Sequence, residues 1–237
     1  MKRAEVSATP GLRPNAILRR YMDLAKLLDL LHSKSLYLRR ADGFADRLEG
    51  ALFPAFRRSM DETHAQGQLE HDADYFYKRA RLGSYVSCWT IGAGDNMALW
   101  QLYGGTRTSV ALTTTVDRLT RVCLTWDRSS LLQKVEYVDH RKKGTFVIGR
   151  YTDVLQYKNT AYSYEDELRV IVPAQNDGWE KNPMGLRLPV PNLNVLVRSI
   201  VVAPEADQQF KHAIEDLCRK YHLHAPVRSS ILSVIPT

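Results

Sequence analysis

The stretch SYEDELRVIV, residues 163–172, carries the most informative pattern in the chain. Glu165, Glu167 and Arg169 occupy every second position, so in an extended strand they share one face, roughly 7 Å apart. The opposite face is mostly apolar, with Tyr164, Leu168 and Val170, and Asp166 falls near the start of the strand. We therefore predict a β-strand with one packed face and one charged face.

The charged face allows two interpretations. Two carboxylates and a guanidinium fixed on a rigid strand can stabilise a developing positive charge or bind a sugar hydroxyl. The same alternation is typical of a solvated edge strand, in which the charges form a ladder on the surface. On this pattern, Glu167, Glu165 and Arg169 are the candidate catalytic residues, and the surface ladder is the alternative.

Composition bounds the class of protein. The 237 residues are 44% hydrophobic and 25% charged, which is ordinary for a globular domain with one sizeable core. The net charge of +7 and the sequence pI of about 9.3 favour a polyanionic partner or a phosphate-bearing ligand. The basic residues form short clusters, at 19–20, 39–40, 57–58, 78–81 and 141–143, rather than one long run. Each cluster also fits a solvated face, so charge alone does not indicate nucleic acid.

Cysteine usage predicts a reducing compartment. Cys88, Cys123 and Cys218 lie far apart without a CxxC pair, so we expect neither a disulfide framework nor a structural zinc site. His222 and His224 follow Cys218, but a fourth ligand at a usual spacing is missing, so we expect no metal. The sequence also contains no apolar signal segment and no run of about 18 apolar residues. We expect a cytoplasmic protein without membrane association.

Turn-forming residues and the periodicity of the apolar residues predict one α+β domain. Residues 1–14 form a polar, mobile lead-in, and residues 15–237 form a single domain with a mixed sheet and flanking helices. The charge-rich segment 50–82 is a helical insertion or a lid. Three further helices are expected: 24–31 capped by Asp23, 96–103 capped by Asp95 and ended by Gly104, and one from Pro204 to Tyr221. Expected strands cover 15–22, 35–38, 84–90, 109–114, 134–140, 164–172, 195–203 and 229–235.

The order of several short motifs resembles a bacterial family known as a domain of unknown function. The motifs are the pair Arg20-Tyr21, FADRLEG (44–50), SCWT (87–90), ALWQLY (98–103) and YEDELR (164–169). Ala45 and Arg47 stand where that family commonly has Asn and Pro. The resemblance covers roughly residues 17–232 and implies a fold, but no activity.

A more distant resemblance implies chemistry. A basic residue on a first strand, a Ser/Thr-bearing strand and a late E-x-E strand look like the Arg-Ser-Glu type of ADP-ribosyltransferase. The resemblance implies NAD as substrate and either ADP-ribosyl transfer or NAD hydrolysis. Glu167 would then be the catalytic residue, stabilising the oxocarbenium ion, and Glu165 would present a nucleophile. The implied cofactor-binding residues are Arg20 or Arg19 for the phosphates, next to Tyr21; Ser87 or Thr90 for the nicotinamide ribose; and Trp89 or Tyr164 for stacking.

Structural roles compete with these assignments. Arg19 and Arg20 also fit a solvated strand end, Tyr21 a half-buried packing residue, and Trp89, Trp100 and Tyr103 the core. Asp46 and Glu49 fit a turn followed by a helix cap, and Cys88 fits a small buried side chain rather than a nucleophile.

Two functional classes and a third possibility stay open. The first is an NAD-dependent ADP-ribosyltransferase or NAD glycohydrolase, as a bacterial toxin or antiphage defence effector. The second is a nucleic-acid-binding protein or nuclease that uses the basic clusters and the aromatic residues 75–77. The third is a regulatory module without catalysis. The sequence identifies neither the acceptor of ADP-ribose, which could be protein, nucleic acid or water, nor an antitoxin partner, nor the oligomeric state.

Overall fold

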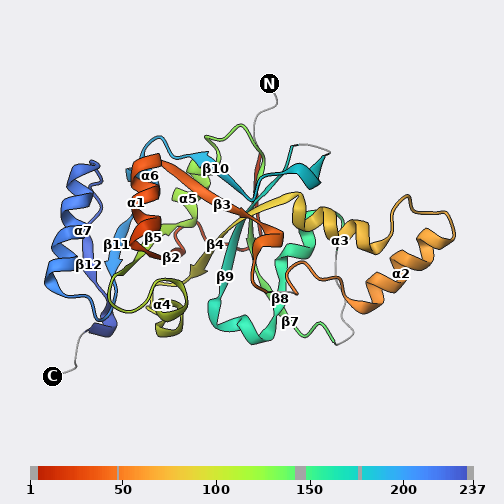
Figure 1. The fold of residues 1–237 in the computed structure, drawn as a ribbon, viewed down its shortest axis with the longest axis horizontal. Coiled ribbons are helices and arrows are strands. Elements are labelled where there is room, and N and C mark those ends of the chain that lie inside the picture. Colours follow the sequence, from red (N-terminus) through yellow and green to blue (C-terminus); the bar gives the residue numbers. More distant parts are fainter. Residues whose placement is uncertain (1–4, 47, 142–147, 176–177, 234–237) are drawn as a thin grey trace.

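A ten-stranded mixed sheet organises the computed structural model, which describes residues 5–46, 48–141, 148–175 and 178–233 (Figure 1). The main path is β1 (Val6–Ala8), β6 (Ser130–Lys134), β9 (Glu167–Pro173), β4 (Ser84–Ile91), β2 (Ile17–Asp23), β5 (Ser109–Thr115), β11 (Ser199–Val202) and β12 (Val227–Ser229). Two strands lie off this path, since β3 (Ser35–Arg40) pairs with β4, and β10 (Gly185–Pro189) pairs with β3. A separate parallel pair joins β7 (Glu136–Val138) to β8 (Tyr157–Asn159). The predicted α+β class with a mixed sheet and flanking helices is confirmed.

Strand β9 is central in the sheet, because it pairs with β4 on one side and β6 on the other. Leu168, Val170, Glu167 and Arg169 are all buried, so the interpretation as a solvated edge strand is wrong. The strand also begins later than the sequence pattern indicates. A 3-10 helix, η3 (Thr160–Glu165), precedes it, and Asp166 takes a left-handed conformation with φ of 38°.

A fork in the sheet lies at β4. The first half of β4 pairs with β3, through Arg39 opposite Val86, whereas its second half pairs with β2, through Arg19 opposite Thr90. Strand β2 then continues along β5 for its whole length, so β2 and β3 diverge from a common neighbour. Helix α1 (Leu24–Ser33) connects the two diverging strands, with Asp23 as its N-cap, as predicted.

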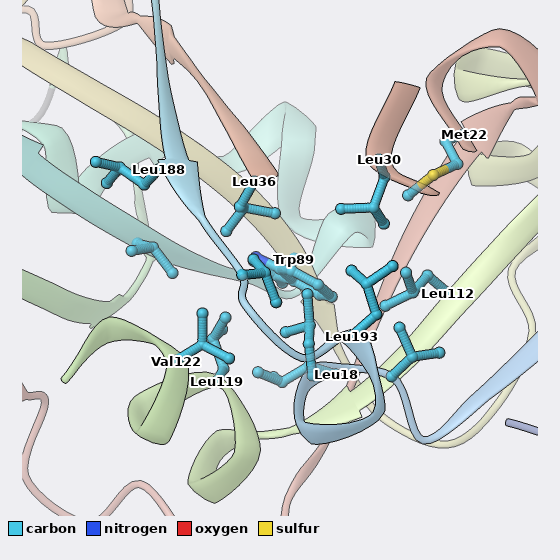
Figure 2. Close-up of a cluster of buried hydrophobic side chains, with 14 of the residues drawn as sticks. Leu18, Met22, Leu30, Leu36, Trp89, Leu112, Leu119, Val122, Leu188 and Leu193 are labelled. Atoms are coloured by element: carbon cyan, nitrogen blue, oxygen red, sulfur yellow. The ribbon is translucent and has the colours of Figure 1, made fainter. Parts of the chain in front are cut away.

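Helices cover both faces of the sheet (Figure 1). The large core on one face includes side chains of α1, α5 (Val116–Cys123), α6 (Leu193–Leu196) and α7 (Gln208–Lys220), together with Leu168 and Val170 of β9. Figure 2 shows Trp89 in the middle of this cluster, near Leu18, Leu30 and Leu36. Two smaller clusters lie on the other face.

The smaller clusters belong to different helices. One joins Tyr21 of β2 to Leu99 and Trp100 of α4 (Met97–Tyr103). The other joins Val86 and Ile171 to α3 (Ala73–Leu82) and to the 3-10 helices η1 (Ala41–Gly43) and η2 (Tyr151–Gln156). Helix α2 (Pro54–Ala65) packs beside α3, so the expected helical segment 50–82 contains two helices. Two short 3-10 helices, η4 (Trp179–Lys181) and η5 (Ile231–Ser233), complete the described elements.

Several predicted boundaries are wrong. Asn96, not Asp95, caps α4, because its side chain accepts hydrogen bonds from Ala98 and Leu99; the helix ends before Gly104, as predicted. Asp207 caps α7, which therefore starts four residues after Pro204. The segment expected as one strand at 195–203 contains the end of α6 before β11. At 229–235, β12 ends at Ser229 and η5 follows, while residues 234–235 lie outside the described residues.

The expected lead-in also contributes to the sheet. Strand β1 pairs in parallel with β6 along Val6–Ala8, so part of 1–14 is an edge strand rather than a mobile tail. Residues 1–4 lie outside the described residues.

Candidate functional site

A cleft of about 760 Å³ lies where β2 and β3 diverge from β4. Three consecutive residues of β4, Cys88, Trp89 and Thr90, line it. Successive side chains of a strand point to opposite faces, so the cleft is lined from both faces of the sheet. The cleft brings together most of the residues that the sequence analysis singles out: Arg19, Arg20, Tyr21, Trp89, Thr90, Glu165 and Glu167. Its volume lies within the roughly 300–1,000 Å³ typical of ligand and cofactor sites.

Arg20 extends into this cleft from β2. Its guanidinium donates to Ser87 Oγ at 2.9 Å and to the backbone oxygen of Tyr37 at 3.2 Å, and it lies 5.9 Å from the centre of the Trp89 ring. Burial lowers the pKa of Arg20, and no carboxylate among the described residues forms an ion pair with it. Arg20 is only partly buried, and a cation in a cleft without a counter-charge favours binding of an anion. Arg20 lies in the middle of β2, opposite Leu112 of β5, so it is not at a strand end.

Arg19 has a different role, because its side chain points to the opposite face. It forms an ion pair with Asp95 and donates to the backbone oxygen of Ala93. Asp95 also accepts from Ser230 Oγ at 2.5 Å and from the backbone nitrogen of Ile231 at 3.0 Å. Arg19 is thus buried in a network that ties the loop before α4 to the C-terminal segment.

Tyr21 supports the same loop. Its hydroxyl accepts from the backbone nitrogen of Asn96 at 3.1 Å, and its ring meets Trp100 edge-on with centroids 4.9 Å apart. Tyr21 is 7% exposed, which agrees with a packing role beside the cleft rather than with a ligand contact made by its hydroxyl.

Glu167 presents a buried carboxylate to the cleft. Its Oε2 accepts from Arg169 at 3.1 Å and from Lys158 Nζ at 3.2 Å. Burial opposes ionisation, but Arg169 and Lys158 outweigh it and lower the pKa of Glu167 to about 2. Glu167 is 3% exposed, so a fixed, buried negative charge lines the cleft.

Arg169 anchors Glu167 from behind. Its guanidinium donates to both oxygens of Glu49, with 2.9 Å to Oε2, and to the backbone oxygen of Leu155 at 2.6 Å. Arg169 does not line the cleft, so it acts on Glu167 rather than on a ligand. Glu49 is buried against Arg169 and does not cap a helix, whereas Asp46 accepts from the backbone nitrogen of Leu48 as a turn residue would.

Glu165 reaches the same place from outside the strand. Lys158 Nζ donates to its Oε2 at 2.5 Å, and the hydroxyl of Tyr103 donates to its Oε1 at 3.1 Å. Glu165 and Glu167 therefore lie close together, as predicted. They are brought together by their shared contact with Lys158, and not by a shared strand face. Tyr103 is 45% exposed and lines the cleft, so its assignment to the core is wrong, whereas Trp100 is fully buried.

The other predicted side chains divide between the cleft and its surroundings. Trp89 is a core residue whose buried indole nitrogen lacks a hydrogen-bond partner among the described atoms, and its ring lines the cleft. Thr90 lines the cleft, and Ser87 is buried and accepts from Arg20. Tyr164 is 41% exposed and lies outside the cleft lining.

Cys88, on β4, lies beside Glu167 of β9. Burial, followed by the charge of Glu167, raises the pKa of its thiol well above the usual range. A protonated thiol is a poor nucleophile, as expected, but Cys88 is only partly buried and lines the cleft. Cys88, Cys123 and Cys218 form no disulfide with one another.

Sequence reasoning missed Lys158, Tyr103 as a cleft residue, and Arg39. Lys158 belongs to a three-residue strand without a recognisable motif, and no spacing connects it with Glu167. Arg39 lines the cleft from β3 and is exposed, and none of the ion pairs among the described residues includes it. That Arg39 shares a cleft with Arg20 becomes visible only when the fork in the sheet is known.

The aromatic residues proposed for nucleic-acid binding contact other side chains. Tyr75 stacks on His71, with ring centroids 3.6 Å apart, and meets Trp179 edge-on. Phe76 packs on Tyr151 with centroids 4.7 Å apart. These contacts do not favour the use of these rings as a stacking platform for bases.

The described residues contain neither a metal-ligand cluster nor a membrane-spanning helix. No group of three or more His, Cys, Asp or Glu side chains there is placed to hold a metal ion. No helix there has the length and apolar character needed to cross a membrane.

Comparison with known proteins gives weak similarities. No protein-family model and no curated protein matches the sequence, so the resemblance to the bacterial domain-of-unknown-function family is not confirmed. The fold is similar to DarT of Thermus sp. 2.9 in complex with ADP-ribosylated ssDNA, with a TM-score of 0.42, 8% identity, and 98% of both chains covered. It is also similar to the same DarT in complex with carba-NAD+, with a TM-score of 0.41, 8% identity, and 93% of this chain and 97% of that chain covered. Similarity at this level does not transfer a function to the chain.

Proposed function

We propose that this protein cleaves the nicotinamide–ribose bond of NAD, as an ADP-ribosyltransferase or an NAD glycohydrolase. The observation that carries the proposal is that one cleft contains both the guanidinium of Arg20, which has no ion-pair partner among the described residues, and the ionised carboxylate of Glu167. A dinucleotide with an anionic diphosphate and a ribose that becomes cationic during cleavage matches both charges.

Arg20 and Arg39 would bind the diphosphate. Both line the cleft, one from β2 and one from β3, and a diphosphate carries two negative charges that two guanidiniums can balance. The Arg39 side chain lies over Gly43, where a Cβ would be only 2.5 Å from its Nε, so Gly43 leaves it room. Ser87 would position Arg20 rather than contact the ribose, and Arg19 would hold the loop before α4.

Glu167 would stabilise the transition state. As nicotinamide leaves, C1′ of the ribose gains oxocarbenium character, and a preorganised carboxylate in a buried site lowers the barrier. Arg169 would position Glu167 without touching the substrate. Trp89 is better placed than Tyr164 to contact the nicotinamide, because it lines the cleft and its indole nitrogen is free to donate.

Glu165 would present the attacking nucleophile. Its two oxygens are bonded to Lys158 and Tyr103, so an acceptor hydroxyl or water must replace one of these bonds before attack. Tyr103 is the partner that can be displaced, because it is half exposed, whereas Lys158 is buried.

We further propose a bacterial toxin or antiphage effector that works in the cytosol, where its three unpaired cysteines would stay reduced. Loss of NAD, or modification of an essential macromolecule, would arrest a cell. An antitoxin partner is part of this proposal. The acceptor is a protein, a nucleic acid or water.

Nicotinamide release tests the proposal. The purified protein is incubated with NAD labelled in its adenylate phosphate, and the label is followed into protein, added single-stranded DNA or RNA, and free ADP-ribose. We expect release by the parent, and a loss on the order of 100-fold or more in Glu167→Gln, because a preorganised charge is removed.

A matched variant controls this experiment. Glu70→Gln makes the same chemical change at a side chain that is 88% exposed, so its turnover should equal that of the parent. No release by the parent, in the presence of all acceptors, would refute the proposed function. Equal release by the parent and Glu167→Gln would remove Glu167 from the mechanism.

A further inference from the structure

Lys158 is a buried cation between the two carboxylates of the site. It lies on β8, is 8% exposed, and donates to Glu165 Oε2 at 2.5 Å and Glu167 Oε2 at 3.2 Å. The ring of Tyr162 lies 4.9 Å from its Nζ and adds a cation–π contact. Every direction open to the ammonium group is therefore satisfied inside the protein.

The surrounding charges give this lysine a specific task. Both terminal nitrogens of Arg169 donate to Glu49, and one of them also donates to Glu167. Lys158 is therefore the cation that Glu165 and Glu167 share. The connected network holds two cations and three carboxylates, which leaves one net negative charge when all are ionised. Without Lys158, two carboxylates would face each other in a buried site, and such pairs resist ionisation of both members.

Lys158 acts on the cleft indirectly. It does not belong to the cleft lining, whereas Glu165 and Glu167 do. A substrate in the cleft would meet the two carboxylates and not the ammonium group. The groups that face the pair from neighbouring elements are Arg169 on β9, Cys88 on β4, Tyr103 on α4, Tyr137 on β7, and Glu49 through Arg169.

We propose that Lys158 is a positioning residue that holds Glu165 and Glu167 side by side as a pair of carboxylates for the cleavage of NAD. This inference rests on the proposed function for its role in turnover, and on the contacts of Lys158 alone for its role in holding the pair. Of the groups around the pair, Arg169, Cys88, Tyr103 and Tyr137 remain when Lys158 is removed, and none of them replaces a cation shared by both carboxylates.

The pH profile of nicotinamide release tests the role in turnover. Glu167 in the parent stays ionised from pH 5.5 to 9, so this group should cause no change in turnover across that range. In Lys158→Met the pair loses its shared cation and takes up a proton. Turnover should then be on the order of 10-fold lower at pH 6 than at pH 8.

Two further variants separate positioning from folding. Lys158→Arg keeps the charge and should keep the profile of the parent. A structural role alone would lower turnover of Lys158→Met by the same factor at every pH, and that result would overturn the proposal. If Lys158→Met does not fold, the double variant Lys158→Met/Glu165→Gln should fold, because one carboxylate is removed together with the cation. Failure of both to fold would also overturn it.

Carboxyl-carbon NMR gives a readout that does not need turnover. In Lys158→Met the carboxyl signal of one member of the pair should titrate between pH 5 and 9, whereas the Glu167 signal should stay constant there in the parent and in the double variant. If the parent releases no nicotinamide but these titrations are found, the proposed function fails and the role of Lys158 in holding the pair stands. If neither carboxyl signal of the pair titrates between pH 5 and 9 in Lys158→Met, the inference about Lys158 fails.

Discussion

At the residue scale, Arg20, which is partly buried, differs from the buried guanidiniums. Arg19 is balanced by Asp95, Arg40 by Asp42, and Arg169 by Glu49, but Arg20 contacts a hydroxyl, a backbone oxygen and an indole ring. Neutral partners do not offset the cost of burying a charge. An anionic ligand would offset it, which is why Arg20 and not Arg19 is assigned to the diphosphate.

Removal of Arg20 should therefore weaken NAD binding more than catalysis. We expect Arg20→Ala to lose roughly 1.5–3 kcal/mol of binding free energy, because charged hydrogen bonds to phosphate disappear. The dissociation constant of NAD, measured by calorimetry, should rise on the order of 10- to 100-fold. Arg121→Ala removes an arginine that is 67% exposed and serves as the control. An unchanged affinity in Arg20→Ala would exclude this residue from the ligand site.

Single residues also show which parts of the candidate site could be predicted from the sequence. Alternation in 163–172 correctly indicated Glu167 and Arg169 on one face, because the strand period is a local property. Glu165 was expected there for the same reason, but the left-handed Asp166 places it in η3, and its meeting with Glu167 depends on Lys158. Contacts made by a residue on a separate short strand have no local signature, so Lys158 could not be predicted.

At the scale of elements, strong local patterns succeeded and short segments failed. Helix α1 and strands β2, β4 and β5 combine clear periodicity with caps or β-branched residues, and all were predicted. Strands β1, β6 and β10 have three to five residues and depend on their partners. Helix α5 was missed because its sequence, VDRLTRVC, follows a β-branched run, and only the side chain of Thr115 marks where the helix begins.

The N-caps of α4 and α7 offer a paired test of what each element does. Asn96→Ala and Asp207→Ala should each lower stability by about 1 kcal/mol, because each side chain satisfies backbone nitrogens at a helix start. Melting temperatures should fall by roughly 2–4 °C in both. Only Asn96→Ala should also lower NAD turnover, since α4 carries Tyr103 to the cleft. Equal turnover in the two variants would show that the position of α4 does not matter for the chemistry.

At the scale of the whole molecule, the fork at β4 creates the site. One strand pairs with two diverging neighbours, and the gap between them exposes residues of both sheet faces to a single cleft. Sequence patterns predicted the strands but not this pairing, because a residue's partner across a sheet depends on long-range topology. Most of the candidate site residues were therefore found one by one, while their common cleft required the structure.

The buried charges of the site also couple folding to pH. The folded-state pKa of Glu167, about 2, lies below its ordinary value of 4.5, so ionised Glu167 stabilises the fold above about pH 4.5. This stabilisation is lost as the pH falls from 4.5 towards 2. We expect the free energy of unfolding, from urea titrations, to fall by a few kcal/mol over that window. Glu167→Gln should show a shallower fall, and an identical slope in both proteins would contradict the assigned pKa.

The central claim is that one cleft holds NAD between Arg20 and Glu167, and a structure of the Glu167→Gln variant with NAD tests it most directly. The isosteric change should preserve the cleft and leave the substrate uncleaved. We expect the diphosphate to contact Arg20 and Arg39, and C1′ of the nicotinamide ribose to lie beside residue 167. NAD bound elsewhere, or no binding at concentrations that saturate the parent, would contradict it.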